Sequence, residues 1–211
     1  MSWLAELDAW KAERLGGLVG DVALAAAAPG DARAQLHVAL ANEINVSELA
    51  AAWMPSTREL DVKLAFARQA GDEAGHFELV AGRLAALGVE LASFAAPASP
   101  LFDYLRGLTG TVERIAAGLY ALESIAYAVN EQFIASCDAR GDAETVRIYR
   151  EMIQPDELAH HELGRRLLER HAAAPDAQAL ARATVGRVLE LAAQTRAAAA
   201  ARLGTRCFPG C

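Results

Sequence analysis

Apolar residues recur every three or four positions through most of the chain, a spacing that predicts amphipathic helices. The apolar stripe is longest in four segments, which span residues 31–54, 56–87, 103–139 and 142–171. Residues that end helices separate these segments: Pro55 follows the first, Gly88 the second and Gly141 the third. The alternating runs of Val, Ile and Thr that are typical of strands do not occur. The pattern therefore predicts an all-α protein.

The breaks between the segments predict their order in space. The first and second segments, and likewise the third and fourth, are joined by short breaks, so each pair is expected to form an antiparallel hairpin. Residues 88–102 contain Pro97 and Pro100, and at about 3.3 Å per residue this connection is long enough to cross the length of a helix bundle. We expect one domain of residues 1–211 whose core, at 31–171, is a four-helix bundle.

Shorter elements flank the expected bundle. The sequence predicts an N-terminal helix at residues 2–18, which ends near Gly16-Gly17, and an alanine-rich C-terminal helix at residues 176–203. Residues 204–211 are expected to form a loose tail. In this tail Cys207 and Cys211 enclose Phe-Pro-Gly, so they are unpaired, form a disulfide or supply two thiolates to a metal.

A short motif, Asp-Glu-x-x-His, occurs twice, as Asp72 to His76 and as Asp156 to His160. Residues three apart share one face of a helix. Each copy therefore directs a carboxylate and an imidazole to one point, which is the geometry of a metal clamp. Two copies predict a site built from two similar halves.

Two further acids occupy apolar positions. Glu43 lies on the stripe of the first segment after Leu40, and Glu123 lies on the stripe of the third after Leu119. An unpaired buried carboxylate costs several kcal/mol, so four of them that face one another need cations between them. Two divalent ions would balance the charge, and the carboxylate-rich set favours iron or manganese. The expected ligands are Glu43, Glu73, His76, Glu123, Glu157 and His160.

Other residues near these ligands have expected roles. Asp72 and Asp156 lie about 100° round the helix from their glutamates, where each could accept the second ring N–H of a histidine from the opposite half. Tyr127 follows Glu123 by one turn, and its hydroxyl would reach the site unless the residue simply packs in the core. Pro155 should bend its helix or insert a wider turn.

Alternative assignments stay open at this point. Glu48 and Glu131 are alternative ligands on the first and third segments. His161, Glu162 and Glu78 point away from the ligand stripe and are expected on solvated faces. Gly75 and Gly164 would either open a pocket for a substrate or allow two helices to pack closely.

The full set of residues resembles a known superfamily. One Glu from each of two helices, with Glu-x-x-His from each of the other two, is similar to the ferritin-like di-iron carboxylate proteins, and the resemblance covers roughly residues 31–171. The aspartate before each motif glutamate resembles bacterial multicomponent monooxygenases and ribonucleotide reductase small subunits. The short chain looks more like small oxygenases such as phenylacetate-ring epoxidase subunits, aldehyde deformylating oxygenases and the di-iron tRNA hydroxylase. Rubrerythrin-type proteins carry a four-cysteine iron module that two cysteines cannot make.

This resemblance implies a ferritin-like bundle with two iron ions, or with manganese or a mixed centre, held by the six residues named above. The expected function is an oxidoreductase that activates dioxygen to oxidise a small organic substrate. Iron oxidation for storage or detoxification is the alternative enzyme, and a non-catalytic metal-binding bundle is the alternative non-enzyme. Flavin and nicotinamide motifs are not seen in the sequence, so a separate electron-donor protein is expected.

Charge and composition limit the partners. The net charge of −7 counts against binding to nucleic acid or to anionic membranes. Apolar runs stay shorter than the roughly 20 residues that a bilayer needs, and the N-terminus lacks the pattern of a secretory signal. Three cysteines do not make a disulfide framework, so we expect a cytoplasmic protein, with a homodimer compatible with the sequence.

Overall fold

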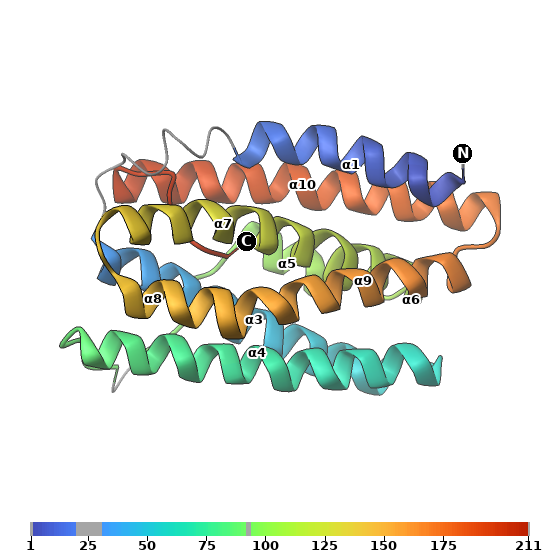
Figure 1. The fold of residues 1–211 in the computed structure, drawn as a ribbon. Coiled ribbons are helices and arrows are strands. Elements are labelled where there is room, and N and C mark those ends of the chain that lie inside the picture. The colour runs from blue at the N-terminus through green and yellow to red at the C-terminus, as the bar shows by residue number, and fades with distance from the viewer. Residues whose placement is uncertain (1, 20–30, 92–93, 211) are drawn as a thin grey trace.

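The computed structural model describes residues 2–19, 31–91 and 94–210, and within these ranges the chain is helical without strands. Figure 1 shows the long helices lying lengthwise in layers. The helices α1 (Trp3–Val19) and α10 (Pro175–Leu203) lie along one side, and α3 (Ala32–Ser56) and α4 (Leu60–Ala86) lie along the opposite side. Between them lie α7 (Glu123–Ala139) and α9 (Gln154–His171). The all-α class is confirmed, and so are the two flanking helices, α1 and α10.

The first predicted helix is longer than expected at its end. Asp31 caps α3 by accepting a hydrogen bond from the Arg33 N–H, as the sequence suggests, but the helix passes Pro55 and ends at Ser56. A proline in the last turn removes one backbone donor, and here the N–H and hydroxyl of Thr57 both donate to the Trp53 carbonyl and close that turn. The following helix, α4, therefore begins at Leu60 rather than near residue 56.

The third predicted helix is not continuous. It consists of α5 (Pro100–Arg106), a break at residues 107–110, and then α6 (Thr111–Arg114), the π-helix η1 (Ile115–Leu122) and α7. The break is held together by side chains, because the buried Arg114 donates to the Leu108 carbonyl at 2.9 Å and the Gly110 N–H donates to Glu113 at 3.2 Å. These contacts satisfy backbone groups that a continuous helix would have paired internally.

The fourth predicted helix contains the wider turn that its proline suggests. It begins with α8 (Ala143–Ile148), which Asp142 caps, continues as the π-helix η2 (Tyr149–Ile153) and ends as α9. Pro155, the second residue after η2, cannot donate a backbone hydrogen bond, so the helix widens just before it. The π-helix η1 ends immediately before the predicted ligand Glu123, and η2 ends about one turn before the predicted ligand Glu157.

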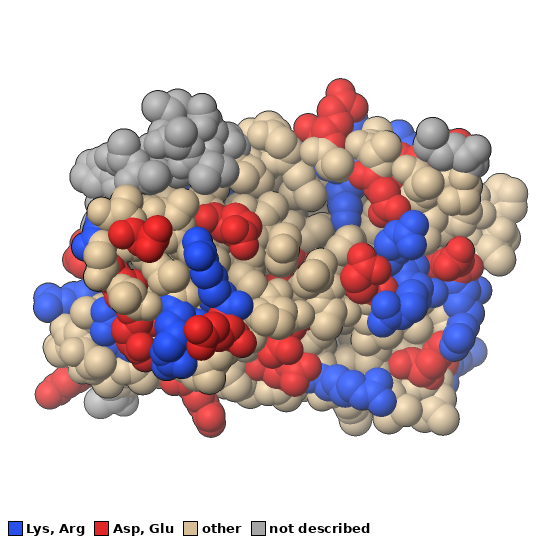
Figure 2. Space-filling model, in the orientation of Figure 1, with Lys and Arg blue, Asp and Glu red and all other residues tan. Residues whose placement is uncertain are grey.

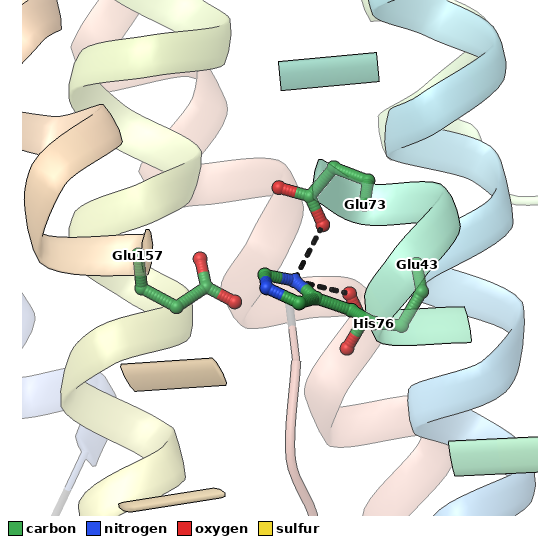
Figure 3. Close-up of side chains that lie close together, drawn as sticks. All are labelled: Glu43, Glu73, His76 and Glu157. Carbon is green, nitrogen blue, oxygen red and sulfur yellow. Dashed lines mark ion pairs between the residues drawn. The ribbon is translucent and has the colours of Figure 1, made fainter. Parts of the chain in front are cut away.

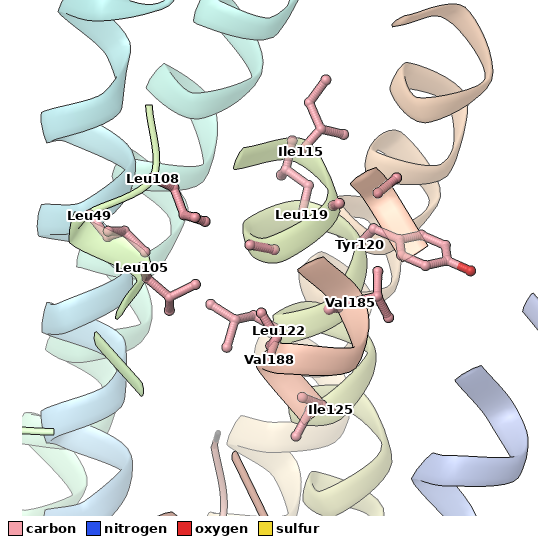
Figure 4. Packing of buried hydrophobic residues seen from close by; sticks show 14 of the residues in the cluster. Leu49, Leu105, Leu108, Ile115, Leu119, Tyr120, Leu122, Ile125, Val185 and Val188 are labelled. Carbon is pink, nitrogen blue, oxygen red and sulfur yellow. The ribbon is translucent and has the colours of Figure 1, made fainter. Parts of the chain in front are cut away.

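The apolar core is divided into two clusters. The large apolar cluster is built around α1, α5, η1 and α10 with the ends of α3, α4 and α9, and Figure 4 shows part of it. The small apolar cluster packs the opposite ends of these helices around Leu40, Val80, Phe133 and Ile153. On α3 the stripe passes from the small cluster at Leu40 to the large cluster at Val46, with Glu43 between them. The predicted ligand layer thus lies between two apolar layers.

The C-terminal tail is not loose, contrary to the expectation for residues 204–211. Cys207 and Phe208 are buried, and Arg196 on α10 donates to the carbonyls of Gly210 at 2.6 Å and of Phe208 at 3.0 Å. The Cys207 thiol donates to the Gln132 carbonyl at 3.2 Å and is free of any disulfide. A buried arginine that satisfies the tail's carbonyls is a tertiary feature, so composition alone could not reveal it. Cys211 lies outside the described residues.

Surface properties of the described part agree with the composition. On the face drawn in Figure 2, lysine and arginine side chains lie among aspartate and glutamate side chains. Of the helices in the described ranges, none is both long enough and apolar enough to cross a bilayer.

Close helix packing explains one of the two glycines near the motifs. A Cβ atom added to Gly164 on α9 would lie 2.6 Å from the Leu119 backbone of η1, whereas one added to Gly75 would meet no atom within 4 Å. Gly164 therefore allows α9 to approach η1, and the close-packing interpretation holds there.

Gly164→Ala should destabilise the protein by about 1–3 kcal/mol, because the new methyl group forces backbone apart in a packed core. Chemical denaturation followed by circular dichroism measures this change. Gly82→Ala is the matched control: it lies within α4, its Cβ would meet no atom within 4 Å, and it should raise stability by up to about 1 kcal/mol. Equal effects of the two substitutions would contradict the packing explanation.

Candidate metal centre

The six predicted ligands meet in one buried layer. Each of them exposes 5% of its surface or less, although all six are titratable. They come from four helical segments: Glu43 from α3, Glu73 and His76 from α4, Glu123 from α7, and Glu157 and His160 from α9. Figure 3 shows Glu157 reaching across from α9 toward the three residues on α3 and α4. Burial of so many ionisable groups in one place costs free energy, which opposite charges, hydrogen bonds or bound protons must offset.

The layer contains two groups of four residues, and in each group one ligand atom from every residue lies within 4.8 Å of the others. The first group holds Glu43 and His76, and the second holds Glu123 and His160. Glu73 and Glu157 belong to both groups. The two groups could therefore hold two metal ions that share a pair of carboxylates.

Unpaired atoms in the layer fit this metal set. Oε1 of Glu73, Oε2 of Glu157 and Nδ1 of both histidines are buried and have no hydrogen-bond partner. Buried polar atoms are almost always paired, so each of these needs an explanation. Carboxylate oxygens and imidazole nitrogens are ligands that iron and manganese bind, and a space of about 10 Å³ borders all four glutamates.

The two histidines are oriented in the same way, each by the opposite half. Nδ1 of His76 lies 3.4 Å from Glu73 and 3.6 Å from Glu43, while its Nε2 lies 3.2 Å from Asp156. His160 repeats this arrangement, with Nε2 at 2.9 Å from Asp72. Each aspartate thus accepts the Nε2–H and fixes Nδ1 as the ligand atom, as the sequence predicted for Asp72 and Asp156.

Protons stabilise the layer when no metal is bound. Burial would lower the pKa of His76, but the facing carboxylates of Glu43 and Glu73 outweigh it and raise the pKa to about 11. The same competition raises the pKa of His160 to about 11. Burial raises the pKa of Glu43 to about 8 and the pKa of Glu157 well above its ordinary value. Metal ions that bind here would displace these protons.

Two residues that the sequence analysis did not assign contact this layer or lie near it. Gln69, one turn before Glu73 on α4, is buried and donates its amide to Glu123. Tyr149 in η2 is 1% exposed, and its hydroxyl has no hydrogen-bond partner. Burial raises the pKa of Tyr149, and the nearby carboxylates of Glu43 and Glu157 raise it further. The sequence pattern marks Gln69, because a polar residue stands there on an apolar stripe. It does not mark Tyr149, because an aromatic residue is ordinary at a core position.

The remaining candidates lie elsewhere. Tyr127 is half-buried, and its carbonyl, not its hydroxyl, accepts a hydrogen bond from Gln154. Neither Glu48 nor Glu131 belongs to the two groups: both are exposed, and Glu131 accepts from Gln154 at 2.7 Å. His161 is half-buried rather than solvated, because its ring packs against Tyr120 with centroids 5.2 Å apart.

Comparison with known proteins identifies the family. A family model described as a protein of unknown function, DUF455, matches residues 25–202. The chain belongs to the DUF455 family. This DUF455 chain also resembles the crystal structure of a domain of unknown function with a heme oxygenase-like fold from Shewanella denitrificans OS217. The TM-score is 0.73 at 16% sequence identity, over 94% of this chain and 92% of that chain.

The structural likeness shows the fold of the DUF455 chain: it is an all-helical, heme oxygenase-like arrangement. Among curated proteins the comparison finds no match. The buried carboxylate and histidine groups are accordingly the feature of the molecule that points to a function.

Replacing a shared carboxylate should lower the number of metal ions bound per chain more than replacing an unshared one. Anaerobic equilibrium dialysis with Mn(II) should give about two ions per chain for the natural protein, about one for Glu43→Ala and less than one for Glu73→Ala, since Glu73 serves both groups. Glu48→Ala on the same helix as Glu43 is the control and should keep about two. If Glu73→Ala and Glu48→Ala bound equal amounts of metal, Glu73 would not be a shared ligand.

Proposed function

We propose that this protein is a di-iron oxidoreductase that uses dioxygen to oxidise a small organic substrate. One observation carries the proposal: Glu73 and Glu157 belong to both four-residue groups, which supports two ions side by side rather than a single ion. Each group adds one further carboxylate and one imidazole, a donor set suited to iron. Manganese or a mixed centre satisfies the same donors.

The chain's own residues have defined roles in this proposal. Iron, when bound, supplies the redox chemistry with dioxygen. Asp72 and Asp156 hold the histidine rings through their Nε2–H bonds and keep Nδ1 directed at the layer. Gln69 holds Glu123 in place through its amide. The two apolar clusters exclude water from the layer on both sides, which strengthens every electrostatic interaction inside it.

The arrangement of the ligand helices supports the finer fold assignment that the sequence suggested. Four helical segments each present a glutamate, and two of them add a histidine three residues later. We propose that this core is a variant of the four-helix ferritin-like plan, elaborated by α1 and α10.

The surroundings favour an organic substrate over iron as the substrate. Iron storage requires an acidic route by which ferrous ions reach the site. In the described residues, a cavity of about 590 Å³ adjoins the layer at Asn42, and no aspartate or glutamate lines it. A cavity of this kind suits an organic molecule. Electrons would come from a separate donor protein, and the acidic charge favours a partner other than nucleic acid.

Oxygen uptake distinguishes the candidate functions. We expect anaerobically loaded, iron-reconstituted protein to consume dioxygen in proportion to about one di-iron centre per chain and then to stop unless a reductant is supplied. A polarographic electrode measures the uptake. An iron-oxidising protein would instead continue to consume oxygen as excess Fe(II) is added and would accumulate ferric mineral.

Two variants make this test specific. Glu123→Ala removes one unshared ligand and should abolish the rapid uptake, whereas Glu131→Ala, an exposed acid on the same helix, should leave it unchanged. Uptake that continues with each Fe(II) addition would favour the iron-oxidising alternative. Protein that takes up iron but never reacts with dioxygen would favour a non-catalytic metal-binding bundle.

A further inference from the structure

A large cavity lies next to the metal layer. It has a volume of about 590 Å³, is open to solvent on one side, and is lined by α3, the segment before and at the start of α5, α10 and the C-terminal tail. The part of α3 that lines it extends from Ala34 to Asn45, which is roughly 16 Å of helix at 1.5 Å per residue. Phe94, Phe102 and Phe208 supply aromatic walls. The cavity therefore has the size and the apolar character of a site for an elongated small molecule.

The charges that line this cavity have one sign. The chain carries a net charge of −7, yet the described lining residues include no aspartate or glutamate and do include His37, Arg196 and Arg202. Arg196 is occupied by the carbonyls of the tail, but Arg202 is exposed and makes no such contacts. His37 lies in the second turn of α3 and Arg202 in the last turn of α10, and Figure 1 shows that α3 begins and α10 ends at the same side of the molecule.

Unpaired polar atoms lie farther along the cavity. The amide nitrogen of Asn42 and the hydroxyl of Ser99 are buried without a hydrogen-bond partner, and both residues line the cavity. Groups of this kind are rare in folded proteins and are commonly satisfied by a ligand or an ordered water. Asn42 also lines the small space among Glu43, Glu73 and Glu157. A ligand that extends to Asn42 therefore ends beside the metal layer.

The C-terminal tail forms the partition at this point. Gly210 lines the small space at the carboxylates, and Phe208 lines the large cavity. Gly210 is fixed from both sides, because its N–H donates to Asn130 at 3.0 Å and its carbonyl accepts from Arg196 at 2.6 Å. With φ at +79° and a Cβ position 2.3 Å from Asn42, it must remain a glycine for the tail to sit so closely.

We propose that this cavity is the substrate site of the metal centre and that it takes elongated apolar carboxylates. The carboxylate would lie at the end with His37 and Arg202, and the apolar body would extend along α3 toward Asn42. The end of the molecule remote from its charge would then lie at Asn42, beside the metal layer and next to the tail that borders it. This inference rests on the proposed function for its chemistry, but the binding step can be measured without it.

Binding to metal-free protein tests the site directly. A dansyl-labelled undecanoate serves as a fluorescent probe, and unlabelled decanoate and decan-1-ol compete for it. The natural protein should bind decanoate more tightly than decan-1-ol by about fivefold at low salt, since an exposed arginine contributes modestly to ion pairing. Arg202→Gln should remove this preference, and Arg187→Gln, an exposed arginine of α10 that pairs with Glu190 outside the cavity, should retain it.

A second pair of variants tests the location. Ala198 and Ala201 are both exposed on α10, but Ala198 lines the cavity and Ala201 does not. Ala198→Trp should weaken probe binding by about tenfold or more by filling the space, while Ala201→Trp should not change it. Equal affinity for acid and alcohol, or equal effects of the two tryptophans, would overturn the proposal.

The outcomes separate this inference from the proposed function. If the protein binds carboxylates selectively but shows no iron-dependent oxygen uptake, the binding site is supported and the proposed di-iron oxidation is rejected. Iron-dependent oxygen uptake by a protein without carboxylate selectivity would retain the di-iron function and reject this substrate class.

Discussion

The structure depends on the burial of four carboxylates in one layer between two apolar clusters. Removal of these groups from water is costly. When no metal is bound, protons on His76, His160 and some of the glutamates offset most of this cost. A fold that needed only stability would fill this layer with leucine and valine, as it does on either side. The charged layer at the centre of this apolar core could hold metal ions.

The two halves of the chain complete each other at this layer. The aspartate of each motif orients the histidine of the other motif, so neither Asp-Glu-x-x-His copy forms a finished clamp alone. Both π-helices lie in the second half, before Glu123 and Glu157, where a widened turn changes the face on which later residues emerge. The first half is regular α-helix at its ligands. Asn42 on α3 and Gly210 in the C-terminal tail also border the space at the carboxylates.

The buried carboxylates of this layer could be predicted from the sequence, because a carboxylate on an apolar stripe is conspicuous even in a single chain. The same reasoning placed Asp72 and Asp156 against the opposite histidines, from a rotation of about 100° per residue. It also anticipated a wider turn at Pro155. It did not single out Tyr149, because this residue lies in a π-helix, where counting α-helical turns back from Glu157 no longer gives the face.

Tertiary contacts account for the other errors. The break before α6 is held by Arg114, and the tail is held by Arg196, in each case by a buried guanidinium that donates to backbone carbonyls. Nothing in the local sequence distinguishes these arginines from exposed ones. The π-helix η1 lacks a proline, and its position against Gly164 became evident only from the packing of α9.

Anomalous diffraction from crystals grown with Mn(II) or Fe(II) tests the central claim most directly, because it locates each ion relative to the shared carboxylates. The account predicts two peaks in the buried layer, both within bonding distance of Glu73 and Glu157, with His76 at one and His160 at the other. A single peak, or two peaks that do not share these glutamates, would contradict it.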